Sequence, residues 1–248
     1  MVSARHRLFV AQEAAKAFVL NQVRRRGYDI TRGPFSIQLQ RILTTQGIDS
    51  VLDIGANIGQ YGSGLRSAGF SGRIVSCEPQ STAFATLAER AAKDPTWDAV
   101  RTAAGAEHST LTINISANSY SSSFLRTAPL HLQIDPASRV VETEDVPVTT
   151  VDTLLRTHEL RPERTLLKID TQGYEQFVLD GAAEGLATMA AVQLELSLAL
   201  LYEGQQLFEQ MLSRLSRLGF SVHALDPAFF HPSTGQLLWC DGIFVRSD

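Results

Sequence analysis

Short apolar runs alternate with amphipathic segments from about Val51 onward, and no other feature limits the fold of this chain as strongly. The runs have the length of buried strands, and the segments between them place apolar residues at helical spacing. Strands joined by such long connections pair in parallel, so we expect a mostly parallel sheet with helices on both faces. The seven expected strands are residues 51–54, 73–77, 99–103, 166–169, 191–196, 221–225 and 242–245, and the expected helices are residues 60–68, 81–92, 174–179 and 205–218.

The segment from Leu111 to Val148 breaks this rhythm because it is longer than a simple crossover. It contains a strand-like LTINIS, the polar stretch ANSYSSS and a loop with proline and histidine. Two interpretations stay open: the segment covers a substrate site above the sheet, or it forms a surface β-hairpin with a flexible tip. The first makes Ser122, Ser123 and His131 candidate substrate contacts, and the second makes them solvated loop residues.

The first expected strand runs into a glycine-rich turn in the stretch VLDIGANIGQYG. Backbone N–H groups bared by such a turn at a helix start suit a nucleotide-type ligand. Asp53, at the strand end, would face the pocket and disfavour a pyrophosphate, whereas it would attract the ammonium and sulfonium groups of S-adenosylmethionine. The turn therefore predicts an S-adenosylmethionine site; its expected cofactor-binding residues are Asp53, Gly55, Ala56, Asn57 and Gly59.

Glu78 strengthens the prediction of an adenosine cofactor. It ends the second apolar run, 19 residues beyond Gly59. An acidic residue at that distance accepts hydrogen bonds from both ribose hydroxyls in adenosine cofactor sites. A solvated strand end at Glu78 and a helix-capping carboxylate at Asp53 are the structural alternatives.

The stretch LLKIDTQGYE supplies the expected second half of the site. Its strand should lie beside the first one at the topological switch point, where ligands of open α/β sheets bind. Lys168 and Asp170 share one face of that strand, since side chains alternate. Asp170 is the preferred general base and also a cofactor-binding candidate, and Lys168 with a pKa lowered by burial is the second choice.

Glu195 ends the following strand and is the third catalytic candidate, able to reach the acceptor or a bound cation. Asp170 and Glu195 together could share a divalent metal through their oxygens. A metal is not favoured, because the sequence has no histidine or carboxylate cluster at metal-ligand spacing.

The chain resembles the FkbM-type methyltransferases in the blocks LDIGANIGQYG, CEPQSTAFATLAER, TTVDTLL, LLKIDTQGYEQFVLDGA and VQLELS, in that order. The resemblance runs from about Gly47 to the C-terminus and gives a division into an N-terminal helical extension, residues 1–46, and a methyltransferase domain, residues 47–248. It implies a Rossmann-like class I methyltransferase fold with a seven-stranded mostly parallel sheet. It also implies S-adenosylmethionine-dependent methyl transfer to a hydroxyl, often on a sugar or secondary metabolite. The family commonly has a glutamate where this chain has Gln172.

Charge is distributed unevenly along the chain. The net charge of -4 and pI near 5.9 argue against a nucleic-acid partner, because phosphate neutralisation needs a basic surface. Residues 1–32 nevertheless hold seven basic and two acidic residues. Such a leader either touches anionic lipid, which would suit a glycolipid acceptor, or is a solvated helix packed on the domain. Two distant cysteines and no bilayer-length apolar run favour a cytoplasmic protein that is at most membrane-associated.

Two other functions remain as alternatives to the methyltransferase hypothesis. The first is a nicotinamide-dependent oxidoreductase with a degenerate glycine turn, against which Asp53 and the missing third glycine of the dinucleotide motif argue. The second is an inactive cofactor-binding module in a biosynthetic complex. The presence of Asp53, Glu78 and Asp170 disfavours it, because a decayed site would have lost some of them.

Overall fold

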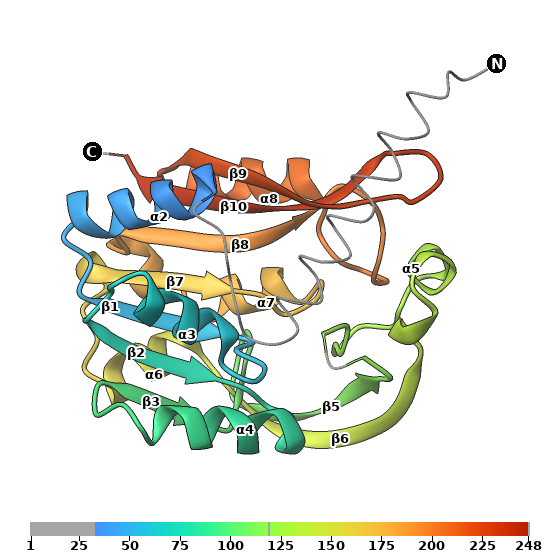
Figure 1. Ribbon diagram of the computed structural model, residues 1–248, viewed down its shortest axis with the longest axis horizontal. Coiled ribbons are helices and arrows are strands. Elements are labelled where there is room, and N and C mark those ends of the chain that lie inside the picture. Colours follow the sequence, from blue (N-terminus) through green and yellow to red (C-terminus); the bar gives the residue numbers. More distant parts are fainter. Residues whose placement is uncertain (1–32, 119, 248) are drawn as a thin grey trace.

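The computed structural model describes residues 33–118 and 120–247, and its centre is one seven-stranded sheet (Figure 1). The strand order is β3-β2-β1-β7-β8-β10-β9. The five strands from β3 to β8 run parallel, whereas β10 is antiparallel to both of its neighbours. The strands are β1 Ser50–Ile54, β2 Arg73–Cys77, β3 Trp97–Val100, β7 Thr165–Ile169, β8 Ala191–Ser197, β9 Phe220–Phe230 and β10 Leu237–Arg246.

The structure confirms the predicted mostly parallel seven-stranded sheet, with one strand misplaced. The third strand, predicted at residues 99–103, is Trp97–Val100, because the chain turns out of the sheet where the Thr102 amide donates to the Val100 carbonyl. The next residues, Ala103–Ala104, form strand β4 of a second sheet.

Helices cover both faces of the main sheet because each strand presents apolar side chains on alternate sides. Leu52 and Ile54 of β1 belong to one core cluster, with residues of α6, α7 and α8. Val51 belongs to the other, with residues of α2, α3 and α4. The helices are α2 Pro34–Thr45, α3 Gln60–Ser67, α4 Ser81–Ala91, α6 Val151–Thr157, α7 Glu175–Asp180 and α8 Phe208–Arg217, with short 3-10 turns at Pro136–Ser138, Pro162–Arg164 and Gly185–Ala187.

The segment that interrupts the alternation forms a small three-stranded sheet, β4-β6-β5, with a helix α5 (Pro129–Ile134). Strands β5 (Ser109–Ser116) and β6 (Val140–Thr149) pair antiparallel, and their inner residues form a separate small core. In Figure 1 the segment extends past the arrowheads of the main sheet, on the side where its parallel strands end. The hairpin is therefore placed at the carboxyl edge, where a site cover would have to lie.

Part of the predicted N-terminal extension packs as an ordinary layer of the fold. Leu39, Ile42 and Leu43 of α2 are buried in the cluster that contains Val51. Residues 1–32, which hold the basic leader, lie outside the described residues, and the domain division at residue 46 stays a prediction. Within residues 33–118 and 120–247, every helix is too short or too polar to span a lipid bilayer.

Candidate functional site

The glycine turn, Glu78 and Asp170 lie at the carboxyl ends of β1, β2 and β7. Gly55 follows β1 with a positive φ of 76°, and a Cβ at this position would overlap the carbonyl oxygen of Asp170. The Asp170 amide donates to the Ile54 carbonyl across the same junction, at 3.0 Å. Only glycine fits here, because both the backbone conformation and the approach of β7 exclude a side chain.

Four backbone amides of the glycine turn donate hydrogen bonds within the protein and are not free to bind a ligand. Gly55 and Ala56 both donate to the Cys77 carbonyl at the end of β2, at 3.1 and 3.0 Å, and Gly59 donates to the Ala56 carbonyl at 2.9 Å. The Asn57 amide donates to Glu78. The expectation of bare N–H groups is thus wrong for these four residues, because the turn folds back onto β2. A pyrophosphate would not find these donors available.

Asp53 does not face the pocket, in contrast to the prediction. It lies inside β1, fully buried, on the face covered by α3 and α4. Its Oδ1 is 3.2 Å from Lys168 Nζ and its Oδ2 accepts from Ser76 Oγ at 3.0 Å. The reason is register: Asp53 pairs with Ser76 on β2 and with Lys168 on β7, so the three side chains share one face.

Lys168 binds the backbone of the glycine turn and is a poor candidate for the general base. Its Nζ donates to the Gly55 carbonyl at 3.2 Å and lies 3.5 Å from Asp170 Oδ2. Burial lowers the pKa of Lys168, but the carboxylates of Asp53 and Asp170 outweigh burial and hold that pKa above its usual range. The predicted lowered pKa is therefore wrong, because Lys168 is a paired ammonium that has no lone pair to accept a proton.

Glu78 lies where the sequence places it, directly after β2, with 3% of its surface exposed. Its two carboxylate oxygens accept from the amides of Asn57 at 2.8 Å and Gln80 at 2.9 Å. A carboxylate has about four lone-pair positions, so two stay open for further donors. Burial raises the pKa of Glu78 to about 7 against the opposing effect of the two amides. The alternative of a solvated strand end is excluded by this burial.

Asp170 is the accessible carboxylate among these groups. Its side chain is 42% exposed, whereas that of Asp53 has no exposure. Oδ1 accepts from Gln172 Nε2 at 2.8 Å, and Oδ2 faces Lys168. Both oxygens are therefore held in place while the side chain stays open to an incoming group.

Glu195 lies partly buried on β8 next to this carboxylate. Burial raises the pKa of Glu195 well above its usual range, and the neighbouring carboxylates of Asp170, Glu175 and Asp241 raise it further. Glu175 has a structural role of its own, because it accepts from the amides of Thr171 and Gly173 and closes the turn between β7 and α7.

The predicted substrate contacts are buried, and the two serines are hydrogen-bonded inside the protein, whereas Nδ1 of His131 has no hydrogen-bond partner among the described residues. Ser122, Ser123 and His131 are 7%, 2% and 4% exposed. Ser122 Oγ accepts from the Ser116 amide, Ser123 Oγ donates to the Gln172 carbonyl, and the His131 ring packs edge-on against Tyr202. Ser122 thus holds the inserted segment together and Ser123 attaches it to the main sheet, which gives both a structural role. The substrate contacts predicted at Ser122, Ser123 and His131 stay predictions.

Sequence reasoning gave no role to three residues that the structure brings to this edge. Gln172 contacts Asp170, and Tyr202, 1% exposed, donates to Gln172 Oε1. Gln60, at the start of α3, has a buried Oε1 without a hydrogen-bond partner among the described residues. An orphaned acceptor beside the glycine turn fits a bound cofactor with donor groups. Only the departure of Gln172 from the family pattern marked any of them in the sequence.

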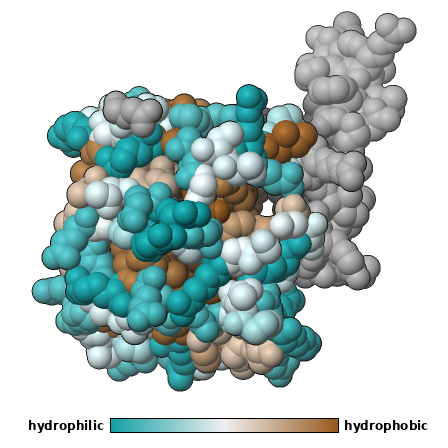
Figure 2. All heavy atoms as spheres, turned by 90° about the vertical axis from the view of Figure 1, so that its left-hand side faces the viewer, coloured by the Kyte–Doolittle hydropathy of each residue, from teal (hydrophilic) through white to brown (hydrophobic). Residues whose placement is uncertain are grey.

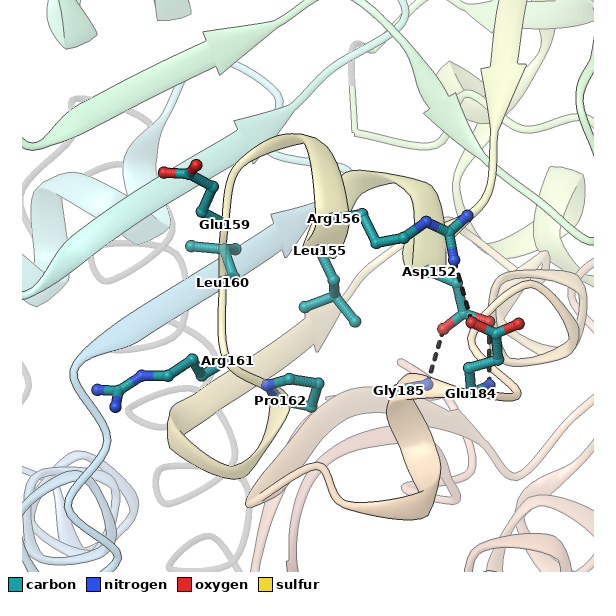
Figure 3. Close-up of a pocket in the computed structure, with 9 residues that line it drawn as sticks. All are labelled: Asp152, Leu155, Arg156, Glu159, Leu160, Arg161, Pro162, Glu184 and Gly185. Atoms are coloured by element: carbon teal, nitrogen blue, oxygen red, sulfur yellow. Dashed lines mark hydrogen bonds and ion pairs between the residues drawn. The ribbon is translucent and has the colours of Figure 1, made fainter.

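A hollow of about 410 Å³ lies at the opposite end of the sheet, before β7 begins (Figure 3). Leu155, Leu160 and Pro162 line it, and Asp152 uses its carboxylate to accept from the amides of Glu184 and Gly185. Figure 2 shows this end of the molecule as mainly hydrophilic with small apolar areas. Open α/β sheets bind ligands at the carboxyl ends, so this hollow is not the candidate site.

The described part of the chain, residues 33–118 and 120–247, contains no group of three or more histidine, cysteine or acidic side chains placed to hold a metal ion. The two cysteines, Cys77 and Cys240, are buried and free.

Comparison with known proteins points to one family. Residues 53–222 match the family model described as Methyltransferase FkbM domain. No curated protein matches the chain. Similar solved structures include methyltransferase FkbM from Methylobacillus flagellatus, which is 15% identical with a TM-score of 0.49 over 79% of this chain and 43% of that one. This chain thus spans less than half the length of that protein.

Two further solved structures align along most of both chains. The TehB-like SAM-dependent methyltransferase from Corynebacterium glutamicum is 12% identical with a TM-score of 0.41, covering 96% of this chain and 99% of that one. The magnesium protoporphyrin IX methyltransferase from Synechocystis, solved with bound SAM, is also 12% identical, with a TM-score of 0.43 over 90% and 89%.

Proposed function

This chain belongs to the FkbM methyltransferase family, and on that premise we propose that it is an S-adenosylmethionine-dependent O-methyltransferase whose acceptor is a hydroxyl group. When bound, S-adenosylmethionine supplies an electrophilic methyl group on a sulfonium. The observation that carries the proposal is that a buried Glu78 and an accessible Asp170 lie at the same edge of the sheet. The Glu78 carboxylate suits the ribose hydroxyls of an adenosine, and the Asp170 carboxylate suits an acceptor hydroxyl.

Cofactor binding, in this proposal, depends on Glu78 and on the glycine turn, whose amides are already hydrogen-bonded within the protein. The two open lone-pair positions of Glu78 are suited to the two hydroxyls of a ribose. The turn amides of Gly55, Ala56 and Gly59 are already bonded, so the site offers little to a pyrophosphate. Asp53, Glu78 and Asp170 are three carboxylates near one ammonium, Lys168, and their net negative charge attracts a cationic cofactor.

The acceptor side depends on Asp170. A hydroxyl becomes a better nucleophile when a base accepts its proton as the new bond forms, and the base must be held at hydrogen-bond distance. Gln172 and Lys168 fix the two oxygens of Asp170, and its exposed side chain leaves room for the acceptor. Glu195, partly buried beside Asp170, would donate a hydrogen bond to a polar acceptor when protonated, a state that its raised pKa favours. We assign proton acceptance to Asp170 and acceptor binding to Glu195.

The acceptor class that we propose is a sugar hydroxyl on a glycolipid or secondary metabolite. Support comes from the carboxylates at the site, which suit a polyhydroxylated molecule, and from the basic residues 1–32, which would bring the protein to an anionic lipid surface. On this proposal the enzyme works in the cytoplasm and contacts the membrane peripherally.

The family assignment removes the support for a nicotinamide-dependent oxidoreductase. The inactive-module alternative is disfavoured because a buried Glu78 and an accessible Asp170, the two carboxylates that the proposed reaction uses, are both present at this edge of the sheet. Direct measurement separates all three functions. Calorimetric titration should give micromolar binding of S-adenosylmethionine and of its demethylated product, and no binding of NAD. NAD binding without S-adenosylmethionine binding would refute the proposal.

Transfer itself is tested with S-adenosylmethionine labelled in its methyl group and fractionated cell lipids and metabolites as acceptors. We expect a labelled product whose methyl carbon has the chemical shift of a methyl ether. Asp170→Asn should lower kcat by about 10²- to 10⁴-fold, the usual contribution of a general base, and should lower cofactor affinity by a much smaller factor, through the loss of one nearby negative charge. Asp180→Asn, on the surface of α7 and paired with Arg214, is the matched control and should keep full turnover. Unchanged turnover in Asp170→Asn would remove it as the base.

A further inference from the structure

Gln172 has a backbone conformation that residues with side chains seldom adopt. Its φ is 56°, in the left-handed region, directly after Thr171 in the turn that follows β7. Such a conformation is strained in a residue other than glycine and persists only where the surroundings fix it. Ser123 from the inserted segment provides one fixing contact, because its Oγ donates to the Gln172 carbonyl at 2.7 Å.

The side-chain amide of Gln172 is fixed as well. Its Nε2 donates to Asp170 Oδ1 at 2.8 Å, and its Oε1 accepts from the Tyr202 hydroxyl at 3.0 Å. The reverse orientation would place Oε1 against the Asp170 carboxylate, two acceptors facing each other, so one orientation is favoured. Hydrogen bonding from the same amide also offsets part of the raised pKa of Glu195.

Tyr202 cannot move freely. It is 1% exposed, its hydroxyl also lies 3.0 Å from the Ser121 carbonyl, and its backbone pairs with Thr127. Gly173 packs directly on its ring, since a Cβ at Gly173 would be 3.0 Å from the ring atom Cδ2 of Tyr202. Gln172 is thus hydrogen-bonded to Tyr202, in the loop after β8, and to Ser123, in the inserted segment. Gln172 in turn donates a hydrogen bond to Asp170.

We propose that Gln172 is a positioning residue: it orients the Asp170 carboxylate toward the acceptor, and its neutral amide hydrogen-bonds to the carboxyl groups of both Asp170 and Glu195. This inference rests on the proposed function, in which Asp170 accepts the proton. It assigns the inserted segment a role in the site, because Ser123 and the Ser121 carbonyl hold Gln172 and Tyr202 in place.

The charges around Asp170 decide what a carboxylate at position 172 would do. Lys168 from β7 is the nearby cation, whereas Glu195 from β8, Glu175 from α7 and Asp241 from β10 are acidic. Tyr202 from the loop after β8 stays a neutral phenol, because burial and Glu195 raise its pKa. A glutamate in place of Gln172 would put another carboxyl in hydrogen-bond contact with Asp170, and two such groups share a proton.

The first test follows the Asp170 carboxyl by carbon NMR in the full chain, with its signal assigned by its loss in Asp170→Asn. Gln172→Glu should move the titration midpoint of that signal upward by about one pH unit or more. Gln176→Glu is the matched control, because it adds the same charge on α7, where Gln176 bonds to the Gly204 carbonyl and not to Asp170. It should move the midpoint by less than about 0.3 unit.

The second test measures turnover with the acceptor fraction that yields the labelled product. Gln172→Ala should lower kcat by about 10- to 100-fold, the cost of a misplaced catalytic group, with the acceptor KM within twofold. Tyr202→Phe, which keeps the ring and removes the hydroxyl, should lower kcat less and leave the thermal midpoint within 2 °C or about 1 kcal/mol of wild type.

The outcomes separate this inference from the proposed function. If S-adenosylmethionine fails to bind the wild type, the proposed function fails, while the NMR titration still decides whether Gln172 controls Asp170. An Asp170 midpoint that is the same in Gln172→Glu and wild type, or a kcat of Gln172→Ala equal to wild type, overturns the positioning role.

Discussion

At the residue scale, the centre of the site is a buried ion pair rather than an open carboxylate. Asp53 and Lys168 face the α3 side of the sheet, where Lys168 also lies 5.3 Å from the centre of the Tyr61 ring. Removing one partner of a buried pair leaves the other charge without compensation, whereas removing both is often tolerated. The pair is thus a structural link between β1, β7 and the Gly55 carbonyl.

Lys168→Met should lower the free energy of unfolding by about 3 to 5 kcal/mol, because Asp53 then remains charged and buried. The double variant with Asp53→Asn should recover at least half of that loss. Urea denaturation of both proteins measures the difference. A single variant as stable as wild type would show that the two charges are not paired as described.

Glu78 makes cofactor binding depend on pH. Its folded-state pKa of about 7 lies above the ordinary 4.5, so the folded protein loses stability from this group as pH rises from about 4.5 to about 7. Ribose hydroxyls that donate to its carboxylate favour the ionised form and lower that pKa again. Binding should then release a proton below pH 7.

S-adenosylmethionine affinity should accordingly be up to about tenfold higher at pH 8 than at pH 6, following the linkage relation for one group. Calorimetry at both values gives this ratio, and buffers of different ionisation enthalpy report the proton. Glu78→Gln should bind more weakly and lose the pH dependence. A slope that persists in Glu78→Gln would assign it to another group.

At the element scale, the turn between β1 and α3 brings the two halves of the site together. Gly55 has a positive φ and contacts the Asp170 backbone, whereas a Cβ added to Gly64, inside α3, would meet open space, with no neighbouring atom within 4 Å. A glycine-to-alanine substitution is therefore hindered at Gly55 and unhindered at Gly64, although the two residues are only nine positions apart.

Gly55→Ala should lower the free energy of unfolding by at least about 2 kcal/mol, through backbone strain and steric overlap with β7. Gly64→Ala should raise it by up to about 1 kcal/mol, since alanine favours a helix interior. Thermal and urea unfolding of the two variants are compared directly. Equal effects would contradict the close approach of β7 at Gly55.

At the scale of the whole molecule, α2 belongs to the same core as the sheet. Ile42 is 2% exposed and packs in the cluster with Val51 and Ile243, whereas Ile37 of the same helix is 56% exposed. A boundary at residue 46 that separated two folding units would let α2 unfold without affecting the sheet. Shared burial predicts instead that both unfold together.

Ile42→Ala should lower the free energy of unfolding of the whole domain by about 2 to 4 kcal/mol, the usual cost of truncating a buried isoleucine. Ile37→Ala should change it by less than about 0.5 kcal/mol, as expected for an exposed site. Near-ultraviolet and far-ultraviolet circular dichroism should give one common midpoint. A sheet midpoint unaffected by Ile42→Ala would support the independent extension.

The sequence by itself determined the alternation of strands and helices, six of the seven main strands and the positions of Glu78 and Asp170 at strand ends. Helix α6 and the separate three-stranded sheet were not predicted. These features follow from local periodicity and from the turn residues, which act over a few neighbours along the chain. The family resemblance, which rests on motif order, was confirmed by the match over residues 53–222.

Only the tertiary structure decided where the polar groups point and what they contact. Asp53 was expected to face the pocket but pairs with Lys168, and the turn amides were expected to be bare but bind Cys77 and Glu78. Each depends on strand register or on a contact between segments about 20 to 115 residues apart in the chain. Gln172 is held by Ser123 and Tyr202 from two other loops for the same reason. Periodicity assigns a side chain to a face of its own strand, but its partner is chosen by the packing of segments that are distant in sequence.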